Sequence, residues 1–282
     1  MKIERNHYFS QETTFKCGGK AAFYCEVESI TEFCNLLKFH KGELYILGGG
    51  SKTLCRDAGF DGLVISTKKL DKINICESEN SLLLECESGV RFDKMHKYCA
   101  ENGLGGLEFL AGIPASAGGA AVMNAGAFGE EVGSYIEAVE VFEDGGLKIL
   151  GKENLQFSYR NSSLKNKFIT KVWFRVAKSQ KNDIINKQNL FLARRAASQP
   201  KGLASAGSVF KRKGDVIPAK IIDELGLKGM REGGAAVSEA HAGFIVNLGN
   251  ATADDVVRLI EKVRARVLAE RGIELENEIN II

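Results

Sequence analysis

Alternating apolar and polar positions predict short strands through the first two-thirds of the chain. Ile136–Phe142 alternates as IEAVEVF, which is typical of a half-buried strand. Gly145 and Gly146 then turn the chain into Leu147–Leu150, so a hairpin is expected there. Further strand-like runs follow turn residues or lie between them, namely 20–27 after Gly18-Gly19, Leu44–Leu47, Leu63–Ile65, Ile73–Cys76, Leu82–Cys86 and Phe168–Val176.

Helical spacing of apolar residues occurs between these strands and dominates toward the C-terminus. One helix should follow Ser29, one should cover Arg91–Asn102 and end at Gly103, and one should cover about Asp215–Leu225. Thr252 and Asp255 form a capping-box pattern ahead of a long helix. We also expect a terminal strand over 273–282. The polar, amide-rich segment 177–189 predicts a domain boundary, with a helix beyond it running to about 197.

Glycine is concentrated in the stretch 103–133, where nine of 31 residues are glycine. Two buried, backbone-lined loops, Ile113–Gly119 and Asn124–Gly129, are predicted to surround a large ligand such as a pyrophosphate. A packing segment where a helix meets a sheet is the alternative. Gly48–Lys52, GGGSK after a strand, is a second candidate phosphate loop, for which a plain glycine turn is the alternative. The P-loop and GxGxxG patterns are absent from the sequence.

Composition narrows the function classes. The 282 residues carry 38 Lys+Arg and 36 Asp+Glu, so a formal charge of +2 provides no global field for nucleic acid or an acidic membrane. No apolar run approaches a membrane span, and the expected location is the reducing cytoplasm. All seven cysteines lie within the first 99 residues, mostly in apolar patterns, where cysteine acts as a small hydrophobe. Disulfides or metal ligation are the alternatives, and no metal site is predicted.

Arg160, Ser208 and Glu278 have no special pattern individually, but they lie in a series of motifs. In chain order these are GGGSK, IPASAGGA, MNAGAFG, YRNS, SAGSVFK, LKG…GGAAVS and LENE. This series, from about Thr13 to Ile279, resembles the UDP-N-acetylenolpyruvoylglucosamine reductase family in its compact type II form. The family completes UDP-N-acetylmuramate in bacterial cell-wall synthesis, and its members use bound FAD and NADPH.

The resemblance implies an α+β fold with two domains. An FAD-binding domain of the vanillyl-alcohol oxidase (PCMH) type would cover 1–178, and a smaller substrate-binding domain would cover 179–282. The implied partners are NADPH and UDP-N-acetylglucosamine enolpyruvate, and the implied state is a cytoplasmic monomer. Two alternatives stay open: an FAD-dependent oxidase of a sugar or alcohol, and a non-catalytic nucleotide-binding protein. None of the four histidines lies in a glycine loop, so FAD is expected to bind non-covalently.

The resemblance also implies roles for individual residues. Ser208 looks like the proton donor, and Arg160 with Glu278 resembles the pair that steadies charge developing on the substrate carboxylate. The implied substrate contacts are Tyr159, Lys211 and Arg212. The implied FAD contacts are Gly48, Gly49, Gly50, Ser51, Lys52, Ile113, Pro114, Ser116, Gly118, Gly119, Asn124, Ala125, Gly126 and Gly129. The chain departs from the family pattern at four positions, with Lys52 and Arg212 for asparagine, Ala115 for glycine and Asn280 for arginine.

Overall fold

The computed structural model describes residues 2–78 and 81–282, which pack into two compact units. Unit 1 consists mainly of Tyr24–Gly49 and Leu63–Arg195. Unit 2 consists of Glu4–Phe23, Gly50–Gly62 and Ala196–Ile282. Two N-terminal segments therefore pack with the C-terminal part of the chain. The expected division at 178/179 into a cofactor and a substrate domain follows chain order and stays a prediction.

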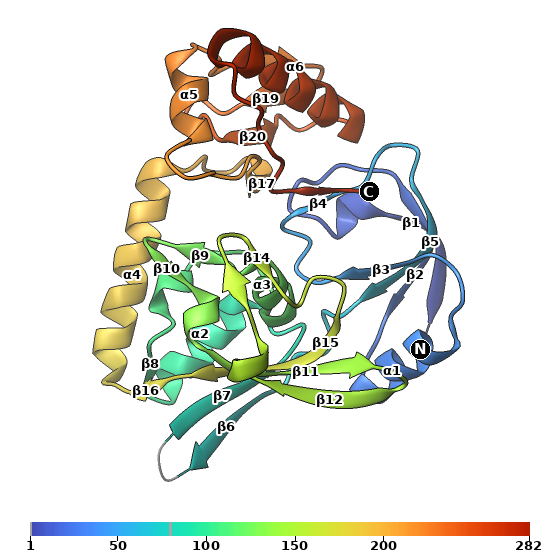
Figure 1. Ribbon diagram of the computed structural model, residues 1–282, viewed down its shortest axis with the longest axis vertical. Helices are drawn as coiled ribbons and strands as arrows, with labels where there is room; N and C mark the ends of the chain where they lie inside the picture. Colours follow the sequence, from blue (N-terminus) through green and yellow to red (C-terminus); the bar gives the residue numbers. More distant parts are fainter. Residues whose placement is uncertain (1, 79–80) are drawn as a thin grey trace. The chain divides into compact units, whose positions relative to one another are not determined.

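A five-stranded antiparallel sheet is the centre of unit 1 (Figure 1). Its strands, in spatial order, are β12 (Gly146–Gly151), β11 (Ile136–Glu143), β15 (Phe168–Arg175), β7 (Ser81–Glu87) and β6 (Ile73–Ser78). Helix α3 (Ala117–Met123) packs on β7 and β15. Helix α2 (Phe92–Glu101) buries Phe92, Met95 and Cys99, the face that the sequence predicts. These elements share one apolar core.

A second sheet has the order β1 (Ile3–Tyr8), β2 (Lys20–Glu26), β5 (Phe60–Ser66) and β3 (Leu44–Leu47). Strand β3 pairs in parallel with residues 63–66 of β5, and this pair lies in unit 1 beside α1 (Ile30–Phe39), which Ser29 caps by accepting from the Glu32 N–H. The line between the units passes through β2 and β5. The glycine segment that follows β3 is divided in the same way: Gly48 and Gly49 belong to unit 1, and Gly50 belongs to unit 2.

Unit 2 contains the antiparallel sheet β17 (Ala204–Ser208), β20 (Phe244–Asn247), β19 (Ala235–Val237) and β18 (Arg231–Glu232). Helix α6 (Ala253–Arg271) packs on β18 and β19, and α5 (Pro218–Glu224) packs on α6 (Figure 1). The predicted capping box of Thr252 and Asp255 is confirmed. The core includes Phe15 and Leu54 from the N-terminal segments.

Short elements complete the fold. The paired strands are β9 (Gly126–Ala127) with β10 (Glu130–Glu131), β13 (Phe157–Ser158) with β14 (Asn161–Ser162), β16 (Ala177–Lys178) with β8 (Leu104–Gly105), and β21 (Asn280–Ile281) with β4 (Thr53–Leu54). The 3₁₀ turns are η1 (Phe9–Gln11), η2 (Glu108–Leu110), η3 (Val132–Ser134) and η4 (Lys152–Asn154).

Three predicted elements are wrong in detail. The helix expected beyond residue 189 begins earlier, because α4 (Lys181–Ser198) starts at Lys181, inside the polar segment 177–189. Most of its side chains are exposed and only Ile184 is buried, so its sequence lacks the continuous apolar stripe that marks a packed helix. Helix α5 begins only at Pro218, whose fixed φ suits the first turn. The terminal strand expected over 273–282 is limited to β21, because residues 273–279 form no strand and pair only through an isolated bridge between Asn277 and Phe210.

The cysteines agree with their interpretation as small apolar residues. Cys17, Cys25, Cys55, Cys86 and Cys99 are buried. Burial raises the pKa of the Cys17 and Cys99 thiols to about 12, and that of Cys25 and Cys55 to about 11. Protonated thiols are poor nucleophiles and poor metal ligands.

Replacing Asp255 should reduce stability in a pH-dependent way. Hydrogen bonds, first from Thr252 and then from Gly234, hold the pKa of this buried carboxyl below its usual value. A lowered folded-state pKa stabilises the protein above the unfolded pKa, roughly 4, and this is lost as pH falls through the folded pKa. We expect Asp255→Asn to lower the free energy of unfolding by about 1–3 kcal/mol at neutral pH. The difference in the free energy of unfolding between wild type and Asp255→Asn should become smaller near pH ~3. Urea titrations measure it, with Asp254→Asn as the control.

Candidate active site

Gly48 and Gly49 pack directly against the predicted loop Ile113–Gly119 within unit 1. A Cβ added to Gly48 would lie 2.5 Å from Ser116 Oγ, and one added to Gly49 would lie 3.0 Å from Pro114 O. Contacts this short leave little room for a side chain, so glycine lets the two segments approach closely at both positions. The two segments that the sequence proposed as phosphate loops therefore form one glycine-lined cradle, Gly48-Gly49 with Pro114–Ser116.

The predicted loop Ile113–Gly119 is in part a helix. Ser116 is the N-cap of α3 and accepts from the Gly119 N–H at 3.4 Å, so Gly118 and Gly119 lie in the first helical turn. A Cβ on Gly118 would approach Ser88 Cβ to 2.8 Å, which shows that glycine lets the helix pack closely on the end of β7. The predicted loop is therefore wrong from residue 117 on, where the alternative of a packing segment between a helix and a sheet applies; both arrangements favour glycine.

Arg160 and Tyr159 form a two-residue turn between β13 and β14, adjacent to the segment Asn124–Gly126. Arg160 takes a left-handed φ of 53° and donates from Nη2 to Gly126 O at 2.8 Å. Its guanidinium lies 4.9 Å from the centre of the Tyr159 ring. Fully buried Asn124 donates to Ser158 O at 2.9 Å and accepts from the Gly133 N–H at 3.0 Å. Four predicted site residues thus meet here, whereas Gly129 lies exposed beyond them.

In unit 2, three separate segments converge around one ammonium group. Lys52 Nζ lies 2.7 Å from Glu278 Oε1 and donates to Ser208 O at 2.8 Å. Glu278 is buried, and its backbone N–H donates to Val209 O at 2.6 Å. Ser208 is the last residue of β17 and is half-buried. Two of the predicted catalytic residues therefore share a partner that the sequence assigned to the cofactor.

The basic turn after Ser208 is held by its own surroundings. Lys211 forms an ion pair with Glu276, and its N–H donates to Glu276 O at 2.8 Å. The exposed Arg212 donates from Nε to Gly214 O at 2.9 Å. An anionic ligand would have to compete with Glu276 for Lys211, while the Arg212 side chain is exposed.

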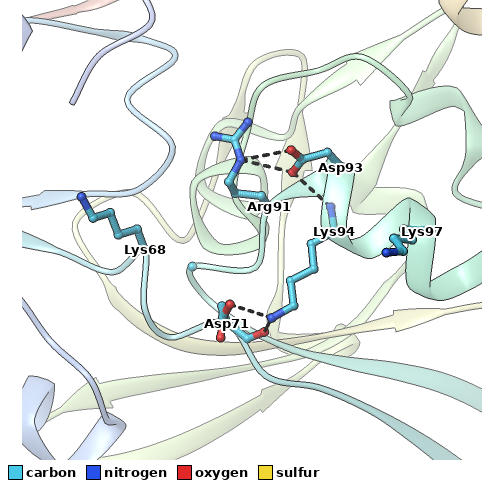
Figure 2. Close-up of a pocket in the computed structure, with 7 residues that line it drawn as sticks. Lys68, Asp71, Arg91, Asp93, Lys94 and Lys97 are labelled. Carbon is cyan, nitrogen blue, oxygen red and sulfur yellow. Dashed lines mark hydrogen bonds and ion pairs between the residues drawn. The ribbon is translucent and has the colours of Figure 1, made fainter. Parts of the chain in front are cut away.

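A hollow of about 450 Å³ in unit 1 is lined by residues that the sequence did not single out. Figure 2 shows its cationic wall and its ion pairs, Arg91 with Asp93 and Lys94 with Asp71. The full lining is Lys68, Asp71, Gly89, Arg91, Asp93, Lys94 and Lys97. The hollow adjoins the cradle, because Arg91 bridges to Ser116. Its cations come from two segments with no common motif, so no pattern could have revealed it.

Comparison with known proteins decides the family. The model for FAD binding domains matches residues 21–149, and the model for C-terminal domains of UDP-N-acetylenolpyruvoylglucosamine reductase matches residues 199–282. A protein of that name from Thermotoga petrophila is 43% identical over 280 residues, which cover 96% of each chain. The chain belongs to the UDP-N-acetylenolpyruvoylglucosamine reductase family. A reductase of the same name from Pseudothermotoga lettingae is 41% identical and aligns with 99% of this chain and 98% of its own.

A solved structure agrees with this assignment. The crystal structure of the UDP-N-acetylenolpyruvylglucosamine reductase from Thermus caldophilus has a TM-score of 0.85 and 34% identity, and covers 100% of this chain and 99% of its own. Membership of the reductase family and the α+β fold with an FAD-binding domain, both inferred from ordered motifs, are confirmed. The individual site residues stay predictions.

Proposed function

We propose that this chain catalyses the NADPH-dependent reduction of UDP-N-acetylglucosamine enolpyruvate to UDP-N-acetylmuramate through non-covalently bound FAD. The observation that carries the proposal is the match to a relative of that name along 96% of both chains, with both domain models found in order. The reaction would supply a peptidoglycan precursor. The contacts in each unit indicate which residues perform the separate steps.

The cradle suits a dinucleotide cofactor. A pyrophosphate can approach main-chain N–H groups closely only where side chains are absent, which is the condition at Gly48 and Gly49. Ser88 Oγ, next to Gly118, is buried and has no hydrogen-bond partner among the described residues, so it can donate to an acceptor that binds there. We assign FAD to the cradle and to Asn124–Gly126. Bound FAD would supply hydride transfer between NADPH and the enolpyruvyl group.

The remaining chemistry is a protonation and a charge to be balanced. Addition of hydride to the β-carbon leaves negative charge at the α-carbon and carboxylate of the substrate, and a proton must then reach the α-carbon. We assign the proton to the Ser208 hydroxyl. Arg160 would stabilise the developing charge, since fixed charges at the reacting centre are usually the largest catalytic contribution. Glu278 would assist at the same step, and Tyr159, Lys211 and Arg212 would bind substrate.

A methyl group at Gly48 should weaken FAD binding. The new Cβ would lie only 2.5 Å from Ser116 Oγ, so the serine side chain must move. This movement disturbs the cap of α3 and the surface of the cradle. Overpacking of this kind costs about 1–3 kcal/mol, so Gly48→Ala should bind FAD roughly tenfold more weakly or worse. Gly146→Ala is the matched control, because no atom lies within 4 Å of its added Cβ. Fluorescence titration of the apoprotein with FAD measures the affinity of each variant. Equal FAD affinities of the two variants would contradict the assignment of FAD to Gly48.

The proposed function has a direct test. The purified protein should be yellow, acid should release its FAD, and NADPH consumption should depend on UDP-N-acetylglucosamine enolpyruvate. Mass spectrometry should identify UDP-N-acetylmuramate as the product. A colourless protein that does not take up FAD would contradict the proposal. NADPH-reduced flavin that air reoxidises rapidly without enolpyruvyl substrate would instead indicate an oxidase.

The cytoplasm is the compartment that we propose, because NADPH and nucleotide-activated sugars are cytoplasmic metabolites. Within the part of the chain that the structure describes, no helix combines the length and the apolarity needed to span a bilayer.

A further inference from the structure

Lys52 connects the segments that carry two of the proposed catalytic residues. Its Nζ lies 2.7 Å from a carboxylate oxygen of Glu278 and 2.8 Å from the carbonyl oxygen of Ser208. Nothing in the sequence relates Lys52 to either residue, since its contact with Ser208 spans 156 positions. All three residues belong to unit 2, so the contacts lie within one compact body.

The burial of the ion pair distinguishes it from a surface salt bridge. The Glu278 side chain is only 4% exposed and that of Lys52 is 24% exposed. Exposed pairs contribute little, but a buried carboxylate that loses its partner is left with an uncompensated charge. The ammonium also lies close to Gly207, where an added Cβ would be 3.3 Å from Lys52 Nζ. The local fold therefore leaves room for a cation at this point.

Main-chain hydrogen bonds fix both ends of the pair. The Asn280 N–H donates to Lys52 O at 2.7 Å, as part of the parallel pairing of β21 with β4. The Glu278 N–H donates to Val209 O at 2.6 Å. The backbones of Lys52 and Glu278 are thus tied to neighbouring segments, and the ammonium ties their side chains and the Ser208 peptide together.

We propose that Lys52 is a positioning residue, which holds the Glu278 carboxylate and the Ser208 peptide in the geometry that proton delivery requires. The proposal rests on the proposed function. Asparagine, the residue that the resemblance leads one to expect at this position, has a shorter side chain and no charge. Lys52→Asn should therefore impair this chain even though it restores the residue usual in the family.

Rapid-mixing measurements on the FAD-loaded protein test the proposal. They separate flavin reduction by NADPH, the reductive half-reaction, from flavin reoxidation by UDP-N-acetylglucosamine enolpyruvate, the oxidative half-reaction. Lys52→Met keeps most of the length of the side chain, which stays unbranched, and removes its charge. It should slow the oxidative half-reaction about a hundredfold, as misplacement of catalytic groups by about 1 Å can do. The reductive half-reaction and the FAD content should stay close to wild type, and Lys52→Arg should recover most of the lost rate.

A double variant and a surface control make the result specific. Glu278→Gln and Lys52→Met together should slow the oxidative half-reaction by less than the product of the two single effects, because the part of the Lys52 effect that acts through Glu278 is already lost in Glu278→Gln. Lys220→Met removes a lysine that is 72% exposed on α5 and should change neither half-reaction. Multiplied effects in the double variant would overturn the proposal, as would a Lys52→Met protein that loses FAD or is slowed equally in both half-reactions.

Failure of this inference can be told apart from failure of the proposed function. If wild type turns over and Ser208→Ala is slowed, but Lys52→Met reoxidises normally, only the role of Lys52 is wrong. If the enolpyruvyl substrate does not reoxidise the wild-type flavin, the proposed function is wrong and the role of Lys52 falls with it.

Discussion

Ser208→Ala should reduce normally with NADPH and reoxidise about 10²–10⁴-fold more slowly with the enolpyruvyl substrate, the range typical of losing a general acid. The hydroxyl is needed only after hydride has reached the substrate, so the reductive half-reaction does not depend on it. The structure also indicates that alanine is tolerated. Ser208 contributes its backbone carbonyl, not its side chain, to the contact with Lys52, and it is half-buried at the end of β17.

Stopped-flow absorbance of the flavin measures both half-reactions of Ser208→Ala. Ser208→Cys keeps a transferable proton and should retain more activity than alanine. Ser205→Ala is a matched control on the same strand, where a hydroxyl is removed at another half-buried position. A Ser208→Ala protein that reoxidises at the wild-type rate would show that water or another group supplies the proton.

Arg160→Met should slow the oxidative half-reaction by about 10²–10³-fold, the loss expected when one group that stabilises developing charge is removed. Methionine keeps an unbranched side chain at a position with a left-handed φ of 53°, so the backbone strain is little changed. The hydrogen bond to Gly126 O is lost, which makes FAD content an essential second measurement. The oxidative half-reaction of Arg160→Lys should be slower than that of wild type and faster than that of Arg160→Met, because lysine keeps the charge without the planar donor geometry.

The distribution of the Arg160 effect between the half-reactions decides its role. Slow reoxidation with normal FAD content and normal reduction supports charge stabilisation at the substrate. Slowing in both half-reactions together with lost FAD would mean that Arg160 serves mainly to hold the segment Asn124–Gly126. Arg194→Met is a control for removing an exposed arginine stacked near an aromatic ring, in that case Phe191.

Local patterns predicted most of the strands and the long C-terminal helix because each of those elements buries one face. Ile136–Phe142 is β11, and Thr252 caps α6 as expected. The second half of α4 was predicted, but its beginning at Lys181 was missed because only Ile184 is buried in the helix, and a polar exposed helix has the same composition as a segment between domains. The helical position of Gly118 was missed because glycine is needed there for close packing against Ser88, a residue that lies elsewhere in the chain.

The candidate site shows the same difference between local and long-range information. Ordered motifs identified the family and named the residues to inspect. The motifs assign Lys52 to the cofactor loop, whereas its ammonium contacts Glu278, because a side chain's partner depends on which distant segments pair. The cationic hollow has no motif at all. Long-range packing therefore supplied what residue order could not.

The composition of unit 2 has a consequence for how the chain folds during synthesis. Residues 4–23 leave the ribosome well before the rest of unit 2, yet Phe15 belongs to a core whose other members come almost entirely from the last third of the chain. One hydrogen bond, from Asn247 Nδ2 to Phe15 O, closes a loop of 232 positions. Domains usually fold from the N-terminal end as they are made. Here an early segment must wait for a late one, so a nascent chain cut before α6 would leave Phe15 without most of its core, and we expect it to be a substrate for chaperones.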